Sequence, residues 1–229
     1  MNRDDEHLAE PDASGDGRAP RRRRKEARPS ELIAAALELF AEKGFSGTRL
    51  DDVATRAGVS KGTLYLYFDS KEALFKAVVE EDIVTVLVAA EQRLADYAGS
   101  ASELLREMLF NWWEHIGSTP LAGVTKLITA ESRNFPEIAE FYQEQVIARG
   151  RALLRSTLRR GIDSGEFRDL DVETAIDLVI APLLMLAISR FSLGFCAAHT
   201  SPERYLCMHF DLLINGLSRQ RADDESCRS

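Results

Sequence analysis

Apolar residues recur every three to four positions along most of this chain, which is the spacing of one face of an amphipathic α-helix. A clear example begins after Ser30 and is expected to end at Gly44. Its apolar positions are Leu32, Ile33, Ala36, Leu37 and Phe40. The strict alternation of apolar and polar residues that indicates half-buried strands is absent. The pattern therefore predicts an all-α protein with about nine helices.

Two short helical runs follow, and a tight turn separates them. Thr48 is expected to cap the first run in a capping box with Asp51, three residues on. Gly58 is expected to take the left-handed conformation in the turn. Ser60 is expected to cap the second run, which extends to about Phe68. A helix, a short turn and a second helix form a helix-turn-helix, whose second helix enters the major groove of DNA.

The remaining predicted helices are longer and cover residues 70–96, 102–116, 120–131, 136–160, 172–195 and 202–217. The helix over 172–195 is apolar around most of its circumference, which is more than one bundle can bury. We therefore expect the last two helices to form a homodimer interface, to which each protomer contributes two helices. A central helix buried within a single protomer is the alternative interpretation.

The net charge of −8 is unevenly distributed along the 229 residues. Residues 1–17 carry one Arg against six acidic residues, and residues 18–76 carry thirteen Lys or Arg against eight. Residues 77–229 carry fifteen basic residues against twenty-three acidic ones. A positive N-terminal third joined to an acidic remainder is typical of a DNA-contacting module attached to a body that DNA repels.

The two ends of the chain have no periodic apolar pattern. Residues 1–28 include the basic cluster Arg21–Lys25, and we interpret them as a disordered arm that contacts DNA phosphates. A solubilising tail is the alternative interpretation of this cluster. Residues 218–229 are interpreted as a disordered tail.

Several classes of protein are not expected from this composition. The longest uncharged apolar run, residues 178–189, is too short to span a bilayer, and the N-terminus lacks the regions of a signal peptide. Three cysteines without CxxC spacing favour a reducing cytoplasm over a disulfide or zinc framework. The four histidines are scattered, and no nucleophile elbow or P-loop is present. We therefore expect neither enzymatic activity nor a metal or cofactor.

The segment around the predicted helix-turn-helix carries a family resemblance. Its sequence reads FAEKGFSGT over 40–48 and AGVSKGTLYLYFDSKEAL over 57–74, with Val53-Ala54 between them. Over about residues 30–78 it resembles the DNA-binding domain of the TetR (tetracycline repressor) family. The resemblance implies a two-domain helical homodimer that binds double-stranded DNA at a near-palindromic operator, most often as a repressor that a small ligand releases. A DNA-binding regulator without a ligand is the alternative.

The matched positions and their chemistry identify candidate DNA-facing residues. Lys61 can reach a phosphate or a guanine edge, and Thr63 can contact a thymine methyl. Lys71 lies in the first turn of a helix, where a cation is unfavourable unless a phosphate balances it. Leu66 departs from the histidine or tyrosine that the family often has there. The complete predicted set is Thr48, Ser60, Lys61, Gly62, Thr63, Tyr65, Tyr67 and Lys71.

The resemblance divides the chain into a DNA-binding domain at 29–76 and a ligand-binding and dimerisation domain at 77–217. Aromatic residues in the second domain are candidates for an apolar pocket that binds a small apolar or aromatic effector. They are Phe110, Trp112, Trp113, His115, Phe141 and Tyr142, with the imidazole as a polar member. Plain core packing is the alternative for each. Trp112, on the main apolar stripe of its helix, is the strongest candidate.

Overall fold

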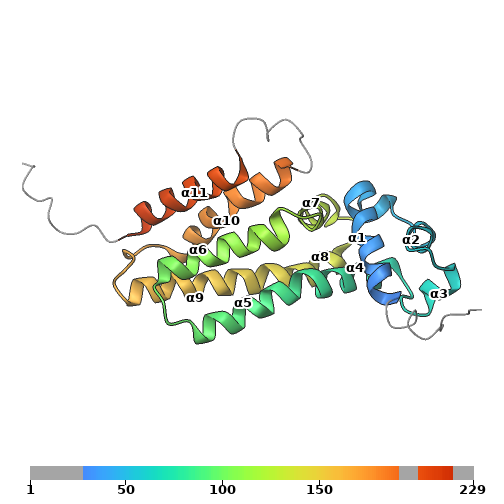
Figure 1. Ribbon diagram of the computed structural model, residues 1–229, viewed down its shortest axis with the longest axis horizontal. Helices are drawn as coiled ribbons and strands as arrows, with labels where there is room; N and C mark the ends of the chain where they lie inside the picture. Colours follow the sequence, from blue (N-terminus) through green and yellow to red (C-terminus); the bar gives the residue numbers. More distant parts are fainter. Residues whose placement is uncertain (1–27, 191–200, 219–229) are drawn as a thin grey trace, which may run out of the picture.

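The computed structural model describes residues 28–190 and 201–218, and within these ranges the chain forms nine continuous helices and no strand (Figure 1). An isolated β-bridge joins Phe167 and Ser218. The prediction of an all-α fold is confirmed. The expected basic arm, apart from Arg28, and the expected tail, apart from Ser218, lie outside the described residues.

The first three helices form a small unit at one end of the molecule (Figure 1). They are α1 (Arg28–Gly47), α2 (Leu50–Arg56) and α3 (Lys61–Tyr65). The regular part of α1 ends where predicted, because Gly44 takes a φ of 73°. Gly58 takes a φ of 66° in the turn before α3, and the Ser60 hydroxyl accepts the Thr63 amide. Both predictions for the turn are confirmed.

The predicted capping box at Thr48 is wrong. Arg49 is the N-cap of α2, and no side chain caps that helix. The Thr48 hydroxyl instead lies 2.7 Å from the Gly44 carbonyl oxygen and 3.1 Å from that of Leu39. It therefore closes the C-terminal end of α1, where carbonyl groups lack helical partners. The Thr48 side chain was expected at the start of α2, but it bonds to carbonyl groups of α1 instead.

Three of the longer helices contain a segment of wider π-type turns. The first of these helices consists of α4 (Lys71–Val78), the π-type segment η1 (Val79–Val84) and α5 (Thr85–Asp96). The second consists of α6 (Ala101–Trp112) and η2 (Trp113–Gly117). The third consists of α8 (Pro136–Tyr142), η3 (Gln143–Ala148) and α9 (Arg149–Asp163). Hydrophobic periodicity predicted each as a single helix, which is correct, but it gave no sign of the π-type turns. Such turns are rare and are frequently found at functional sites.

The remaining helices are α7 (Ala122–Glu131), α10 (Val172–Ile188) and α11 (Pro202–Leu217). α10 continues through Pro182, and its predicted extension to residue 195 runs beyond the described residues. α10 and α11 lie side by side along one flank of the bundle (Figure 1).

Two hydrophobic cores hold these helices together. One is centred on α6, α9, α10 and α11. The other begins among α1–α3 and continues without interruption into α5, α7 and α8. Phe45, at the end of α1, is fully buried in it and stacks edge-on against Phe135, which directly precedes α8, with ring centroids 4.6 Å apart. The helix-turn-helix unit is therefore packed onto the larger bundle rather than tethered to it.

Candidate DNA interface and ligand cavity

Apolar residues pack against one side of the recognition helix α3, and the other side is exposed to solvent. Leu64 of this helix is buried, together with Val53 and Ala54 of α2 and Phe68. Lys61, Gly62 and Tyr65 are exposed, and Leu66 is 81% exposed. A short helix fixed from below and open above is the geometry that a major groove accommodates.

The polar groups at the start of α3 interact with one another. The Ser60 and Thr63 hydroxyl oxygens lie 2.8 Å apart, and the Ser60 hydroxyl also accepts the Thr63 amide. The Lys61 ammonium donates to the Asp51 carboxylate at 2.8 Å, which raises the pKa of this lysine. Since both partners are more than half exposed, this ion pair is weak and leaves Lys61 free to exchange its partner for a phosphate.

Two predicted DNA-facing residues have structural roles inside the domain. Thr48 is 1% exposed, and its hydroxyl is directed to α1 as described above. The Lys71 ammonium donates to the Phe45 carbonyl oxygen at 2.7 Å and to that of Thr48 at 3.1 Å, and it lies 4.4 Å from the centre of the Phe45 ring. Partial burial lowers the pKa of Lys71. These carbonyl groups balance the cation without a phosphate, so the charge argument for a DNA contact at Lys71 no longer holds, and contacts at both residues stay predictions.

Tyr67, the remaining predicted DNA-facing residue, is half-buried, as is Thr63. The structure thus places Ser60, Lys61, Gly62 and Tyr65 together on the open side of α3, with these two at its margin. Their contacts with DNA remain predictions.

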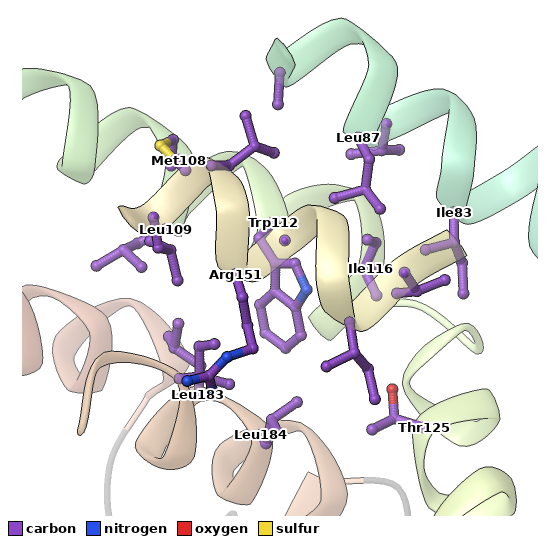
Figure 2. Close-up of a pocket in the computed structure, with 18 of the residues that line it drawn as sticks. Ile83, Leu87, Met108, Leu109, Trp112, Ile116, Thr125, Arg151, Leu183 and Leu184 are labelled. Atoms are coloured by element: carbon purple, nitrogen blue, oxygen red, sulfur yellow. The ribbon is translucent and has the colours of Figure 1, made fainter. Parts of the chain in front are cut away.

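A cavity of about 420 Å³ lies inside the larger bundle, between α5, α6, α7, α9 and α10 (Figure 2). Its walls are mainly aliphatic, and the Trp112 ring stands among them. Representative wall residues are Leu87, Met108, Leu109, Ile116, Leu183 and Leu184. A volume of this size is within the range of pockets that hold small molecules.

Two of the six predicted pocket residues, Trp112 and Tyr142, line this cavity. The other four do not: Trp113 is buried in the core of α6 and α10, and His115 is exposed with its ring nitrogen 3.0 Å from the Asn111 carbonyl oxygen. Phe110 lies under the Arg106 guanidinium, and Phe141 under the Lys76 ammonium. Successive helical residues point about 100° apart, so neighbours such as Trp112 and Trp113 reach different environments.

The polar groups of the cavity include several that were not predicted. Thr125 on α7 lies beside Tyr142, with their hydroxyl oxygens 3.1 Å apart. Tyr142 is 4% exposed, and this burial raises the pKa of its hydroxyl. Arg151 on α9 also lines the cavity and forms ion pairs with Asp177 and Glu173 of α10. The arginines at 151 and 155 and the acids at 173 and 177 are each spaced i, i+4, a pattern that signals paired helix faces.

Each of the three π-type segments contributes wall residues to the same cavity. Ile83 comes from η1, Ile116 from η2, and Val146 and Ile147 from η3. The irregular turns of three separate helices therefore surround one space, which favours a functional role for it.

Neither a group of metal ligands nor a membrane-spanning helix is found in the part of the chain that the structure describes. In residues 28–190 and 201–218, no three His, Cys, Asp or Glu side chains are grouped so that they could hold a metal ion. None of the helices in this part of the chain has the length and apolar character needed to cross a membrane.

Comparisons with known proteins agree with this geometry. Residues 32–78 match the family model for bacterial regulatory proteins of the tetR family, and residues 95–192 match the model for the tetracyclin repressor-like C-terminal domain. The transcriptional regulator EthR of Mycolicibacterium smegmatis is 28% identical over 87% of this chain and 93% of its own length. The uncharacterized regulator YdeS of Bacillus subtilis is 30% identical over 71% of this chain and 79% of its own length.

A solved structure shares the fold. The regulator FadR of Bacillus subtilis, crystallised in complex with stearoyl-CoA, superimposes with a TM-score of 0.62 at 23% sequence identity, covering 82% of this chain and 98% of that one.

Proposed function

The chain belongs to the TetR family of helix-turn-helix transcriptional regulators, and from that premise we propose that it is a homodimeric repressor whose operator binding is controlled by a small apolar effector. The observation that carries this proposal is the cavity between the helices, because one of its wall helices, α7, also contacts α1 of the DNA-binding unit. As a regulator of bacterial DNA it would act in the cytoplasm.

DNA recognition is proposed to rest on α3. In a homodimer the two copies of this helix would enter successive major grooves about 34–36 Å apart, so the operator should be a near-palindrome. Lys61 and Tyr65 are proposed to contact phosphates, which sets affinity, and Thr63 is proposed to influence base preference.

Dimerisation is proposed to occur through α10 and α11. Leu178 and Met185 on α10 and Met208 and Leu212 on α11 are each more than half exposed in the single chain. Leu178 and Met185 are seven residues apart, and Met208 and Leu212 are four residues apart. Each pair therefore lies on one face of its helix. Four large exposed apolar side chains on adjacent helices support an isologous interface with a second copy.

The route from cavity to DNA is proposed to run through α7. Thr125 places this helix in the cavity wall, while Glu131, its last residue, accepts the Ser46 amide of α1 at 3.4 Å. Gly123 packs α7 directly on Ala41, because a Cβ built at that glycine would lie 3.2 Å from the alanine methyl carbon. An effector that prefers a shifted position of α7 would therefore move the DNA-binding unit, by no more than its differential affinity for the two states allows.

Selection of bound fragments from the host genome tests the DNA function directly. We expect enrichment of a short near-palindromic sequence, protected on one face of the duplex. Deleting the gene should raise transcription beside that sequence if the protein represses, and a fall would show an activator. Absence of any enriched sequence would contradict the proposal as a whole.

The effector requires a separate test. Small molecules that raise the melting temperature of the protein should also release the selected fragment, with the same midpoint. A regulator without a ligand, the alternative, would bind its operator equally well under every such condition.

A further inference from the structure

The cavity contains a hydrogen-bond donor without a partner. The indole N–H of Trp112 makes no hydrogen bond to any atom of the described chain, and its half-buried ring lies against the apolar walls. In the view of Figure 2 the ring nitrogen lies on the side that faces Ile116, and the guanidinium of Arg151 lies on the opposite side of the ring. Among apolar walls such a donor is satisfied only where water or a ligand brings an acceptor to it.

A second donor remains at Tyr142 and Thr125. These two side chains have two O–H groups between them, and the single hydrogen bond that joins them uses one. Within the described residues neither hydroxyl has another partner, so one O–H stays available whichever of the two donates. Tyr142 is almost completely buried and Thr125 is half-buried, and both line the cavity, so a ligand there can receive the remaining O–H.

The charged groups of the wall, by contrast, are already paired. Arg151 is bonded to Asp177 and also donates to Glu173 at 3.1 Å. Arg155 donates to Glu173 as well, so two cations face two anions at this position. An anionic ligand would have to displace a carboxylate, and a cationic ligand would have to displace a guanidinium.

We propose that the effector is an uncharged, largely aliphatic molecule with a carbonyl oxygen, such as an ester, amide or ketone, and that Trp112 and the Tyr142–Thr125 pair are the donors that receive it. The proposal rests on the effector-controlled function proposed above and specifies its ligand class. The cavity offers N–H and O–H donors to a neutral acceptor, and it offers no unpaired charge that would offset the desolvation of an ion.

Three probes of matched chain length test this inference: methyl decanoate, decanoate and decyltrimethylammonium, titrated calorimetrically into the full chain at neutral pH. We expect methyl decanoate to bind at least about tenfold more tightly than either ion, because burying an uncompensated charge costs several kcal/mol. Tighter or equal binding of decanoate or decyltrimethylammonium would overturn the inference. Binding of none of the three would overturn it as well.

Two conservative variants test the donors. Trp112→Phe and Tyr142→Phe each remove one donor and keep an aromatic ring, and loss of a hydrogen bond corresponds to about two- to tenfold weaker binding of methyl decanoate. Tyr97→Phe is the matched control, since Tyr97 bonds to Glu107 outside the cavity. Reduced affinity for methyl decanoate in either donor variant, with unchanged affinity in the control, supports the inference. Unchanged affinity in both donor variants contradicts it.

The outcome is independent of the proposed DNA function. A charged probe that binds best and releases the operator would overturn only the ligand class assigned here. Failure of the full chain to select any DNA sequence would instead remove the proposed function, whatever the probes do.

Discussion

At the scale of single residues, Lys71 shows how one side chain can stabilise the junction between two helices. Its ammonium bonds to the carbonyl oxygen of Phe45 at the end of α1 and to that of Thr48 just beyond it, and it lies against the Phe45 ring. Lys71→Met keeps most of the aliphatic stem but leaves these carbonyl groups without their donor. We expect a loss of about 1–3 kcal/mol in unfolding free energy, measured by urea denaturation. Lys43→Met is the control, because Lys43 forms only an exposed ion pair with Asp52.

A competing result would revise the role of Lys71. If Lys71→Met unfolds like the wild type but binds operator DNA more weakly, the lysine acts on phosphate, as the sequence first suggested, and the contacts with α1 contribute little.

Glu173 is a second single residue with a measurable effect, because it makes the stability of the fold depend on pH. Hydrogen bonds from Arg155 and then Arg151 lower the pKa of its carboxyl to about 2, from an ordinary value of 4.5. The folded protein thus binds this proton less readily than the unfolded chain, so the stabilisation is complete above pH 4.5 and is lost as pH falls toward 2. Glu173→Gln should therefore reduce the loss of melting temperature across this acid window. Glu140→Gln, at an exposed position without an ion pair in the described residues, should not.

At the scale of elements, the π-type segment η2 is closely packed against two tryptophans. A Cβ on Gly117 would lie 2.7 Å from ring carbons of both Trp112 and Trp113. Gly117→Ala should therefore displace the indole rings, shift the intrinsic fluorescence and destabilise the fold by about 1–3 kcal/mol. Gly150→Ala is the matched control, because nothing lies within 4 Å of a Cβ there. That substitution should stabilise α9 by about 0.5–1 kcal/mol.

The positions of the helices followed from the sequence because burial imposes a period that the chain must satisfy everywhere. The end of α1 at Gly44 and the cap at Ser60 were equally local, and they were predicted. The Thr48 hydroxyl instead bonds back to carbonyl groups of α1, and the Lys71 ammonium bonds to the carbonyl groups of Phe45 and Thr48, more than twenty residues earlier. Spacing along one helix gives no information on such partners.

The candidate cavity was predictable to a smaller extent, for the same reason. Trp112 was identified because it lies on the apolar stripe of its helix. Thr125 and Arg151 reach the same space from two other helices, and only the packing of the bundle brings them together. Phe110 and Trp113 were predicted to line the pocket only because they are aromatic. Phe110 instead packs against the Arg106 guanidinium, and Trp113 is buried in the core.

At the scale of the whole molecule, two equivalent substitutions can distinguish the proposed dimer interface from the proposed DNA-binding surface. Leu178 on α10 is 64% exposed and Leu66 on α3 is 81% exposed, so an arginine at either position need not disturb the core. Leu178→Arg should yield monomers by sedimentation and weaken operator binding, because a charge at an apolar interface is costly. Leu66→Arg should remain dimeric and change DNA affinity only. A dimeric Leu178→Arg protein would place the interface elsewhere.

The uninterrupted core between the DNA-binding unit and the bundle also bears on how the molecule unfolds. Cutting the chain after residue 78 would expose Phe45, Phe75 and the other side chains that now pack on α7 and α8. The N-terminal fragment should therefore not fold as an independent unit, and the intact chain should show a single calorimetric transition for this core. Energetic communication between cavity and DNA surface would then be a property of one cooperative folding unit rather than of a hinge between two.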